Sequence, residues 1–487
     1  MIKIISDNKE IILNRDEYIK VSTLLKGYDF PMPCGGSGKC LKCKVKVKGD
    51  ISPLSDIELK NLTEKELKDN IRLACFTKIK SGEIYIDYND IVVFKDDVKG
   101  VLKKSSNLGV AVDIGTTTVA AYLYDIDNKN IIDTKGEGNV LSSFGSDVIS
   151  RVHYGIKNGT EKMSALLADQ VEKLITSFVK DKDVKVVVTG NTVMLSILAN
   201  KNLSGFSSYP FTPETLFDVT LNINERNIYF PPAISAFVGS DIYCGILSSR
   251  IYEYENALFL DMGTNGEIVL KAKDKYYTAS AAAGPAFEGA GLTNGVMGKS
   301  GAISKIFSQG LNIRYKTING EPPIGICGSG ICDLISLFIK YKVIDEYGNL
   351  KETGHPFSSL IVDDRFYIGD SGIYITKDDI REVTVAKSAI ISTIYTLIEE
   401  SKINISDIDK FLIGGGFGNY IEEESAFSMG LFPKELKGKT KLCGNTAVDG
   451  AILILDNSFT KNIFDFYSVD VSTNSFFQKT FIENMKY

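Results

Sequence analysis

Four cysteines near the start of the chain have a spacing that suits metal chemistry. Cys34, Cys40 and Cys43 lie in the stretch PCGGSGKCLKC, separated by five and then two residues, and Cys75 follows in RLACF. Four thiolates are ligands for zinc or for an iron–sulfur cluster. Structural zinc sites usually have two C-x2-C pairs, and only Cys40 and Cys43 form one here. Glycines between the ligands let backbone amides approach sulfur, so the pattern favours a cluster, with zinc or ordinary thiols as alternatives.

The elements expected around these cysteines would position them. The stretches 1–6 and 9–14 indicate a hairpin, and 21–29 has helical spacing after a possible cap at Ser22. Residues 43–50 alternate as a half-exposed strand, 55–70 form a polar helical segment, and 71–80 and 82–88 are two further strands. The cysteine spacing is similar to that of 2Fe-2S ferredoxins with a C-x5-C-x2-C loop, and the element order resembles their α+β β-grasp fold. The resemblance implies a 2Fe-2S ferredoxin-like domain over residues 1–97.

Two later loops share one plan about 150 residues apart. In LGVAVDIGTTTVAAYLYD and NALFLDMGTNGEIVLKA, an apolar strand ends in Asp113 or Asp261 and turns through Gly-Thr into a second strand. Such turns aim backbone N–H groups and hydroxyls at an anion, and the adjacent carboxylate can hold Mg2+ through water. The predicted phosphate-binding residues beside these two acids are Gly115, Thr116, Thr117, Thr118, Gly263, Thr264 and Asn265.

A third motif, DKFLIGGGFGNY, places Gly414, Gly415 and Gly416 after a strand. Bare backbone at this position would let a flat nucleotide face lie against the chain. Two helices rich in small residues, around Gly245 and Gly450, are expected to cross closely at a hinge. The two candidates for the catalytic general base are Asp261 and Asp241, because neither histidine lies in a motif.

From Leu108 onward, strands and helices alternate with glycine-rich turns, which is typical of α/β proteins. The three motifs in this order resemble the superfamily of actin, sugar kinases and heat-shock chaperones, called ASKHA. That resemblance implies an ASKHA ATPase domain over 108–487, made of two ribonuclease-H-like subdomains, about 108–250 and 251–487, with ATP between them. A short linker is expected at 98–107.

Two further segments have two possible roles. SAAAGPAFEGAGLTNGVMG contains one acid, Glu288, and PIGICGSGICDLI is a glycine-rich turn entering a helix. Each segment either packs closely beside the hinge or contacts nucleotide. The cysteines outside the first cluster, Cys244, Cys327, Cys332 and Cys443, have no ligand spacing and are expected to be small buried residues.

The bulk properties exclude several classes. A net charge of -6 argues against a general nucleic-acid binder, and no apolar run is long enough for a membrane helix. No segment at the start has the pattern of a signal peptide, so the cytoplasm is expected, where thiols stay reduced. With only two histidines in 487 residues, a histidine-ligated metal site is disfavoured.

A ferredoxin domain joined to an ASKHA ATPase resembles the reductive activators of corrinoid-dependent enzymes. The likeness rests on the motifs above and on SSFGSDVISRV, TGNTVML, DIREVTVAKSAI and IGGGFGN. Unlike many members, this chain is expected to lack a middle domain between cluster and ATPase.

The resemblance implies an enzyme, an ATP-hydrolysing iron–sulfur redox activator. It would pass an electron from a 2Fe-2S cluster to an inactive Co(II) corrinoid protein of a methyltransferase system and so regenerate Co(I). Its implied cofactors are the cluster, ATP and Mg2+. An upstream electron donor and a possible homodimer are implied too, without a nucleic acid or a membrane as partner. Two alternatives stay open: a cluster-bearing, ATP-dependent adaptor or chaperone without electron transfer, and a small-molecule kinase with a regulatory ferredoxin domain.

Overall fold

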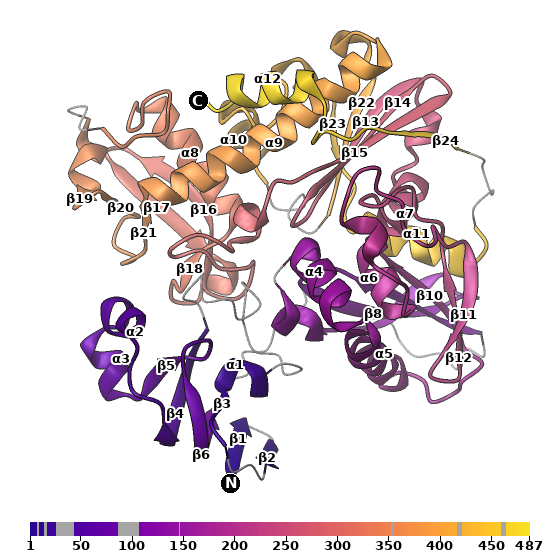
Figure 1. The fold of residues 1–487 in the computed structure, drawn as a ribbon. Coiled ribbons are helices and arrows are strands. Elements are labelled where there is room, and N and C mark those ends of the chain that lie inside the picture. The colour runs from indigo at the N-terminus through magenta and orange to yellow at the C-terminus, as the bar shows by residue number, and fades with distance from the viewer. Residues whose placement is uncertain are drawn as a thin grey trace. The chain divides into compact units, whose positions relative to one another are not determined.

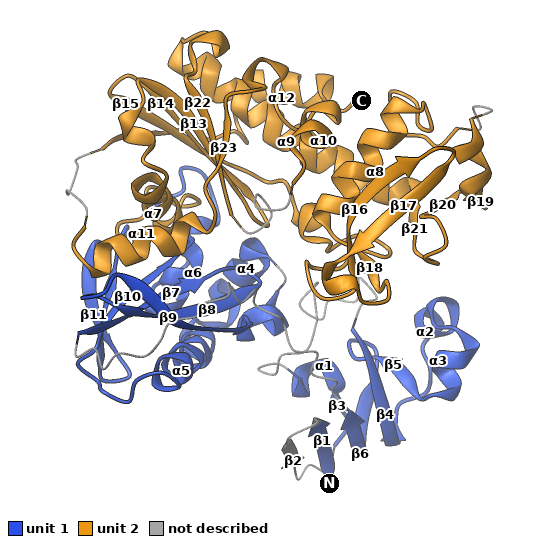
Figure 2. Cartoon of the chain, turned by 180° about the vertical axis from the view of Figure 1, so that it is seen from behind, with its two compact units in different colours: residues 1–230 blue, residues 231–487 orange. Residues whose placement is uncertain are grey.

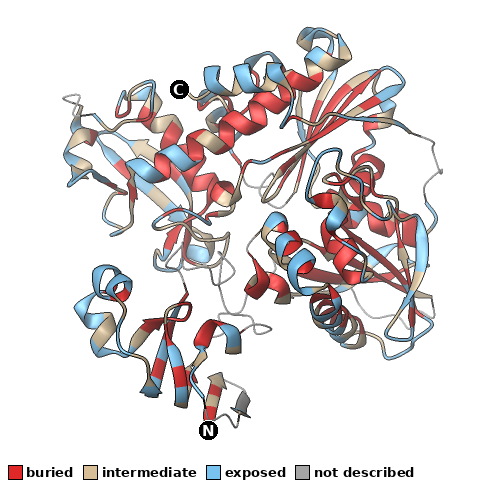
Figure 3. Cartoon of the chain, viewed as in Figure 1, coloured by how far each residue is buried: buried red, intermediate tan, exposed pale blue. Residues whose placement is uncertain are grey.

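The computed structural model describes residues 1–6, 9–13, 17–25, 43–85, 107–145, 147–351, 355–415, 421–458 and 464–487 (Figure 1). The chain divides into two compact units, Met1–Phe230 and Pro231–Tyr487 (Figure 2). Buried residues run along the strands and the inner helix faces of each unit (Figure 3). No helix within the described ranges is long and apolar enough to cross a bilayer.

The chain begins with a mixed β-sheet of the β-grasp type. Its strand order is β2-β1-β6-β4-β5, with β1 parallel to β6 and β3 pairing with β6 at one end. In β4, Val45 and Val47 are buried while Lys44, Lys46 and Lys48 are exposed, so the expected alternation is confirmed. The elements are β1 (Ile2–Ser6), β2 (Lys9–Leu13), β3 (Ile19–Lys20), α1 (Val21–Leu24), β4 (Lys44–Ile51), α2 (Asp56–Asn61), α3 (Glu64–Lys68), β5 (Ile71–Leu73) and β6 (Lys78–Tyr85).

Two local predictions in this domain were wrong, and a third is refined. The polar helical segment 55–70 is confirmed, but it is divided into two helices, because Ser55 and Thr63 each begin one with a capping box. Helix α1 starts after Lys20 without a side-chain cap, so Ser22 is not its cap. Residues 71–80 are not one strand: a turn separates β5 from β6, and this turn contains Cys75.

The remainder of the first unit is one ribonuclease-H-like sheet in the order β11-β12-β10-β7-β8-β9. Strands β7, β8 and β9 form an antiparallel meander, and β10 lies parallel to β7 on its other side. The elements are β7 (Leu108–Ile114), β8 (Thr118–Asp125), β9 (Asn130–Gly138), η1 (Val140–Phe144), α4 (Val148–Asn158), α5 (Glu161–Thr176), β10 (Lys185–Gly190), α6 (Thr192–Leu198), η2 (Ser204–Phe206), β11 (Val219–Ile223) and β12 (Arg226–Phe230).

The second unit repeats this plan, which confirms the internal repeat and the predicted fold class. Strands β13, β14 and β15 form the meander, β22 lies parallel to β13, and the sheet order is β23-β22-β13-β14-β15-β24. Its elements are α7 (Ser240–Ser249), η3 (Ile251–Glu253), β13 (Asn256–Met262), β14 (Gly266–Ala272), β15 (Lys275–Ala281), α9 (Lys377–Ser401), η7 (Ile405–Asp407), β22 (Lys410–Gly414), η8 (Lys434–Leu436), β23 (Thr440–Leu442), α11 (Thr446–Leu455) and β24 (Asp465–Ser468).

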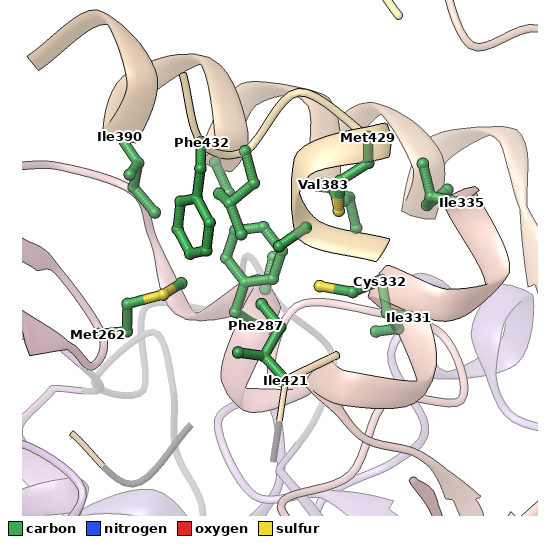
Figure 4. Close-up of a cluster of buried hydrophobic side chains, with 14 of the residues drawn as sticks. Met262, Phe287, Ile331, Cys332, Ile335, Val383, Ile390, Ile421, Met429 and Phe432 are labelled. Carbon is green, nitrogen blue, oxygen red and sulfur yellow. The ribbon is translucent and has the colours of Figure 1, made fainter. Parts of the chain in front are cut away.

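Further elements extend the core of the second unit. Figure 4 shows Met262, at the end of β13, in one buried cluster with Phe287, Ile390 and Phe432. Because side chains alternate along a strand, Asp261 faces the opposite side of the sheet from Met262. The added elements are η4 (Pro285–Glu288), β16 (Ala302–Gln309), β17 (Asn312–Thr317), η5 (Ile318–Gly320), β18 (Gly325–Ile326), α8 (Gly328–Lys340), η6 (Pro356–Leu360), β19 (Ile361–Val362), β20 (Arg365–Tyr367), β21 (Tyr374–Thr376), α10 (Glu423–Ser428) and α12 (Ser475–Glu483).

The predicted domain boundaries stay predictions. Of the expected linker 98–107, only residue 107 falls within the described part of the chain.

Candidate functional site

The first predicted phosphate loop is held by its carbonyl groups. The side-chain amide of Asn139 donates to the carbonyl of Gly115 at 2.8 Å, and the backbone N–H of Asn139 donates to the carbonyl of Thr117 at 2.8 Å. Arg151 donates to the carbonyl of Thr116 at 2.6 Å. Three successive carbonyls of the loop thus accept hydrogen bonds from Asn139 and Arg151. In a trans peptide the following N–H points the opposite way, so the amides of Thr116, Thr117 and Thr118 face away from these donors, as an anion cradle requires.

Sequence reasoning placed Asp113 and the loop 115–118 together, and they adjoin here at the junction of β7 and β8. It gave no role to Asn139, Arg151 or Asn191, which surround the loop. Asn191 donates to the hydroxyl of Thr116 at 3.3 Å. The sequence contained a signal for two of these residues. Arg151 lies in SSFGSDVISRV and Asn191 in TGNTVML, two motifs that resemble the family but were given no role in the site.

The second loop is surrounded by acids. Asp261 on β13 lies directly opposite Glu267 on β14 in the antiparallel pair, and side chains so paired share one face of the sheet. Burial raises the pKa of Asp261 to about 6, against the effect of a hydrogen bond from Thr446 at 3.3 Å. Burial also raises the pKa of Glu267 well above its usual value, and the charges of Asp241 and Asp261 add to the shift. Asp241 and Asp261, the two general-base candidates, therefore both lie near the carboxyl group of Glu267.

Glu267 was missed by sequence reasoning, although counting outward from the turn would have found it. Met262 pairs with Gly266, so the next pair is Asp261 with Glu267. In the first loop, the residue opposite Asp113 is Ala120, which carries no charge. The two loops share a backbone plan but differ in charge.

The tip of the second loop also contacts an acid. The hydroxyl of Thr264 donates to the carboxylate of Glu288 at 2.8 Å, and the N–H of Gly263 donates to the carbonyl of Asn265 at 3.0 Å. Glu288 therefore contacts the loop. Gly289 packs against backbone, since a Cβ there would lie 2.1 Å from the carbonyl oxygen of Val296, whereas a Cβ on Gly291 would meet no atom within 4 Å. Gly330 in the CGSGIC turn is similar, with the carbonyl oxygen of Ile303 at 2.4 Å. Close packing is thus found at Gly289 and Gly330, and the predicted nucleotide contact of these two segments stays a prediction.

The third motif meets the second loop. Gly414 on β22 pairs in register with Asp261, and a Cβ on Gly414 would lie 2.5 Å from Oγ1 of Thr446. Gly415 has a φ of +86°, and a Cβ there would lie 2.6 Å from Oδ1 of Asp261. Gly415 is thus required for close approach to Asp261, and Gly414 for close approach to Thr446, which donates to that acid. Gly416 lies outside the described residues, and the predicted nucleotide contact of this motif stays a prediction.

The two small-residue helices pack as expected. Helix α11 lies against α7, and a Cβ on Gly450 would lie 2.1 Å from the carbonyl oxygen of Cys244. Gly245 of α7 faces the ring of Phe259 on β13. The close crossing of the helices is confirmed at Gly450, whereas Gly245 brings α7 close to β13, and the predicted hinge stays a prediction.

Two of the four predicted cluster ligands are described, and they lie together. Cys43 and Cys75 are buried, and their sulfur atoms are 3.2 Å apart. Two thiolates on one tetrahedral ion, with metal–sulfur bonds of about 2.3 Å, have sulfurs about 3.8 Å apart, so the pair is adjacent as two ligands of one centre must be, and would have to separate slightly to hold it. Cys34 and Cys40 lie outside the described residues. Of the other four cysteines, Cys244, Cys327 and Cys332 are buried, and Cys443 is half-buried.

Glu58 fixes the turn that carries Cys75, a role that sequence reasoning missed. Its carboxylate accepts from the N–H of Leu73 at 3.1 Å and from the hydroxyl of Thr77 at 3.1 Å, on the two sides of Cys75. Arg72 donates to it through Nε at 2.9 Å and through Nη2 at 3.0 Å. Burial alone would raise the pKa of Glu58, but these hydrogen bonds and those from Ser55 lower it to about 2.

Comparison with known families agrees with this geometry. Residues 4–80 match the model of the 2Fe-2S iron–sulfur cluster binding domain, residues 108–254 match the RACo middle region, and residues 255–487 match the C-terminal domain of RACo, the ASKHA domain. The N-terminal domain is therefore of the 2Fe-2S cluster-binding type. The expectation that the chain lacks a middle region was wrong.

Named relatives agree as well. The chain is 34% identical over 385 residues to a corrinoid activation enzyme, RamQ of Eubacterium limosum, and the match covers 72% of this chain and 65% of that protein. It is 26% identical to the [Co(II) methylated amine-specific corrinoid protein] reductase of Methanosarcina barkeri, over 70% of this chain and 68% of that one. The chain thus spans about two thirds of the length of these relatives. A solved reductive activator for corrinoid, iron–sulfur protein superposes with a TM-score of 0.70 at 25% identity, covering 100% of this chain and 98% of that one.

Proposed function

The chain belongs to the RACo family of reductive activators, and from that premise we propose that it returns a corrinoid protein from Co(II) to Co(I) at the expense of ATP. The observation that carries this proposal is the presence on one chain of a 2Fe-2S-type domain and an ASKHA domain, in a chain that superposes over its whole length on a solved reductive activator.

The first step is electron supply. Cys34, Cys40, Cys43 and Cys75 would hold a 2Fe-2S cluster, which accepts one electron from an upstream donor and supplies it to the corrinoid. The protein holds Cys75 in its turn through Glu58 and buries Cys43, so water is kept from this pair of sulfurs. Burial and hydrogen bonding around a cluster set its reduction potential.

The second step is the use of ATP. Co(I) corrinoid is strongly reducing, and transfer from a ferredoxin cluster near about -400 mV is uphill. A nucleotide-dependent change in the ATPase can bias the bound corrinoid protein towards a state that is easier to reduce. The first loop would bind the phosphate chain, and Asp241, Asp261 and Glu267 would position Mg2+ and the attacking water. Hydrolysis then converts ATP and water to ADP and phosphate while one electron reduces Co(II) to Co(I).

The decisive experiment mixes chemically reduced protein with a Co(II) corrinoid protein and follows the Co(I) absorbance band. We expect the band to form with Mg-ATP and not with Mg-ADP or without nucleotide. Cys75→Ser should abolish the signal while ATP binding persists. Equal formation of Co(I) without ATP would contradict the proposal. ATP-dependent remodelling of the partner with no Co(I) would favour the adaptor alternative.

A further inference from the structure

Arg151 is a buried cation that forms no ion pair of hydrogen-bond distance with any residue that the structure describes. It is 1% exposed, and its acceptors are the carbonyls of Gly145 and Thr116 and the sulfur of Met194. None of the ion pairs among the described residues includes it. Burial lowers its pKa to about 10, against the effect of Asp147, so it stays charged at neutral pH.

A second buried arginine in the same unit shows the usual arrangement. Arg226 is 0% exposed, but its Nε lies 2.9 Å from the carboxylate of Glu172. Removing an arginine from water without a carboxylate partner is costly. Arg151 nevertheless stays charged in the interior, next to a loop of the anion-binding type. We take this as evidence that a bound anion balances its charge.

The position of Arg151 suits such a role. It approaches the loop from the side of the carbonyls, and its bond to Thr116 fixes the central peptide. The amides of the loop then face the other way, with the positive charge behind them. Anions bind where several N–H groups and a nearby positive potential coincide. The second loop has no such cation among its described contacts but has Glu267 and Glu288 instead.

We propose that Arg151 is a positioning residue for the phosphate chain of the nucleotide: it locks the Thr116 peptide and supplies the buried charge that makes the first loop bind phosphate. The inference rests on the proposed nucleotide binding and assigns it to particular residues. It also assigns the two loops different tasks, phosphate binding to the first and cation and water positioning to the second.

The test compares affinities for three probes: ATP, inorganic tripolyphosphate and adenosine. Arg151→Gln removes the charge but keeps a hydrogen-bond donor, Arg151→Lys keeps the charge but loses the planar fork, and Arg226→Gln is the matched control. A hydrogen bond to a charged group corresponds to about 10- to 100-fold in affinity. We therefore expect Arg151→Gln to weaken ATP and tripolyphosphate by about that factor and to leave adenosine unchanged. Arg151→Lys should fall between Arg151→Gln and wild type, and Arg226→Gln should match wild type for all three probes.

Several results would overturn the inference. Unchanged ATP affinity in Arg151→Gln, or an equal loss for adenosine and ATP, would show that Arg151 only supports the fold. The same pattern in Arg226→Gln would show that any buried arginine of this unit has that effect. If Arg151→Gln does not fold, Arg151→Lys serves instead, and its loss of affinity for ATP is compared with its loss of affinity for adenosine. The outcome is independent of corrinoid chemistry: wild-type protein that reduces Co(II) without ATP contradicts the proposed function, whereas a loss of tripolyphosphate binding in Arg151→Gln still supports this inference.

Discussion

Asp261 and Glu267 lie directly opposite one another on β13 and β14, two acids on one face of a sheet where like charges repel. Gly414 is the register partner of Asp261 on one side, and Ser280 is that of Glu267 on the other. Ser280 donates to Glu267 at 3.2 Å, and Thr446 donates to Asp261 at 3.3 Å. Two acids held this close favour a shared proton or a bound cation.

The first prediction concerns pH. Burial raises the pKa of Asp261 from 3.8 to about 6. Between about pH 4 and 6 the folded protein therefore holds a proton that the unfolded chain has released, so stability falls as the pH rises. Glu267, whose pKa is also raised by burial and by the charges of Asp241 and Asp261, contributes to stability in the same direction. Glu267→Gln should be more stable than wild type at pH 8, because it removes a buried carboxylate whose ionised form is disfavoured, and its stability should depend less on pH. Urea unfolding of nucleotide-free protein measures this, with the exposed Glu321→Gln as control. Equal pH slopes in wild type and Glu267→Gln would show that the pair does not interact.

The second prediction concerns hydrolysis. Asp261→Asn should lower ATPase turnover by orders of magnitude, because the carboxylate needed to orient water or Mg2+ is lost. The fold should persist, since Asn has the same shape and the close approach of Gly415 is retained. The visible spectrum of the cluster domain serves as the internal control. Unaltered turnover would remove Asp261 from the site.

The third prediction concerns the turn of Cys75. Arg72→Met leaves the buried carboxylate of Glu58 without its charged partner, which costs about 3–5 kcal/mol. We expect loss of the visible absorbance per chain, with the unfolding transition of the ASKHA part unchanged. Lys65→Met, at an exposed site on α3, should retain the cluster. Full cluster content in Arg72→Met would show that the ion pair does not hold the ligand turn.

The fourth prediction compares two glycines of the helix crossing. Gly450→Ala places a methyl group 2.1 Å from a backbone carbonyl, which cannot move without separating α7 and α11. Gly245→Ala places it 2.7 Å from the ring of Phe259, which can turn. We expect Gly450→Ala to lower the free energy of unfolding by about 3 kcal/mol or more and Gly245→Ala by about 1 kcal/mol. A larger loss of stability in Gly245→Ala than in Gly450→Ala would show that the contact between α7 and α11 is not the tighter of the two.

The fifth prediction concerns the tether between the domains. A short linker raises the local concentration of the cluster domain to about millimolar. Cutting the chain in the predicted linker 98–107 and mixing the pieces at micromolar concentration should therefore slow corrinoid reduction strongly. If the mixture matches the intact chain, the tether has no role in transfer.

The sequence alone determined the features that depend on local pattern. The spacing of Cys34, Cys40 and Cys43, the two Asp-x-Gly-Thr loops and the GGG motif were sufficient to predict the domain types and the fold class, because each motif needs a fixed strand–turn geometry. Alternating burial in β4 and the small-residue helices α7 and α11 were predictable for the same reason.

Only the tertiary structure decided which distant residues complete each site. Arg151 and Glu58 lie 35 and 17 residues from the groups they position, Thr116 and Cys75, and no periodicity relates them. Long-range hydrogen bonds are chosen by packing, which a local pattern does not contain. The contrast in charge between the two loops has the same origin. Their backbones repeat, but one is backed by a buried guanidinium and the other by carboxylates, because different elements pack behind each turn.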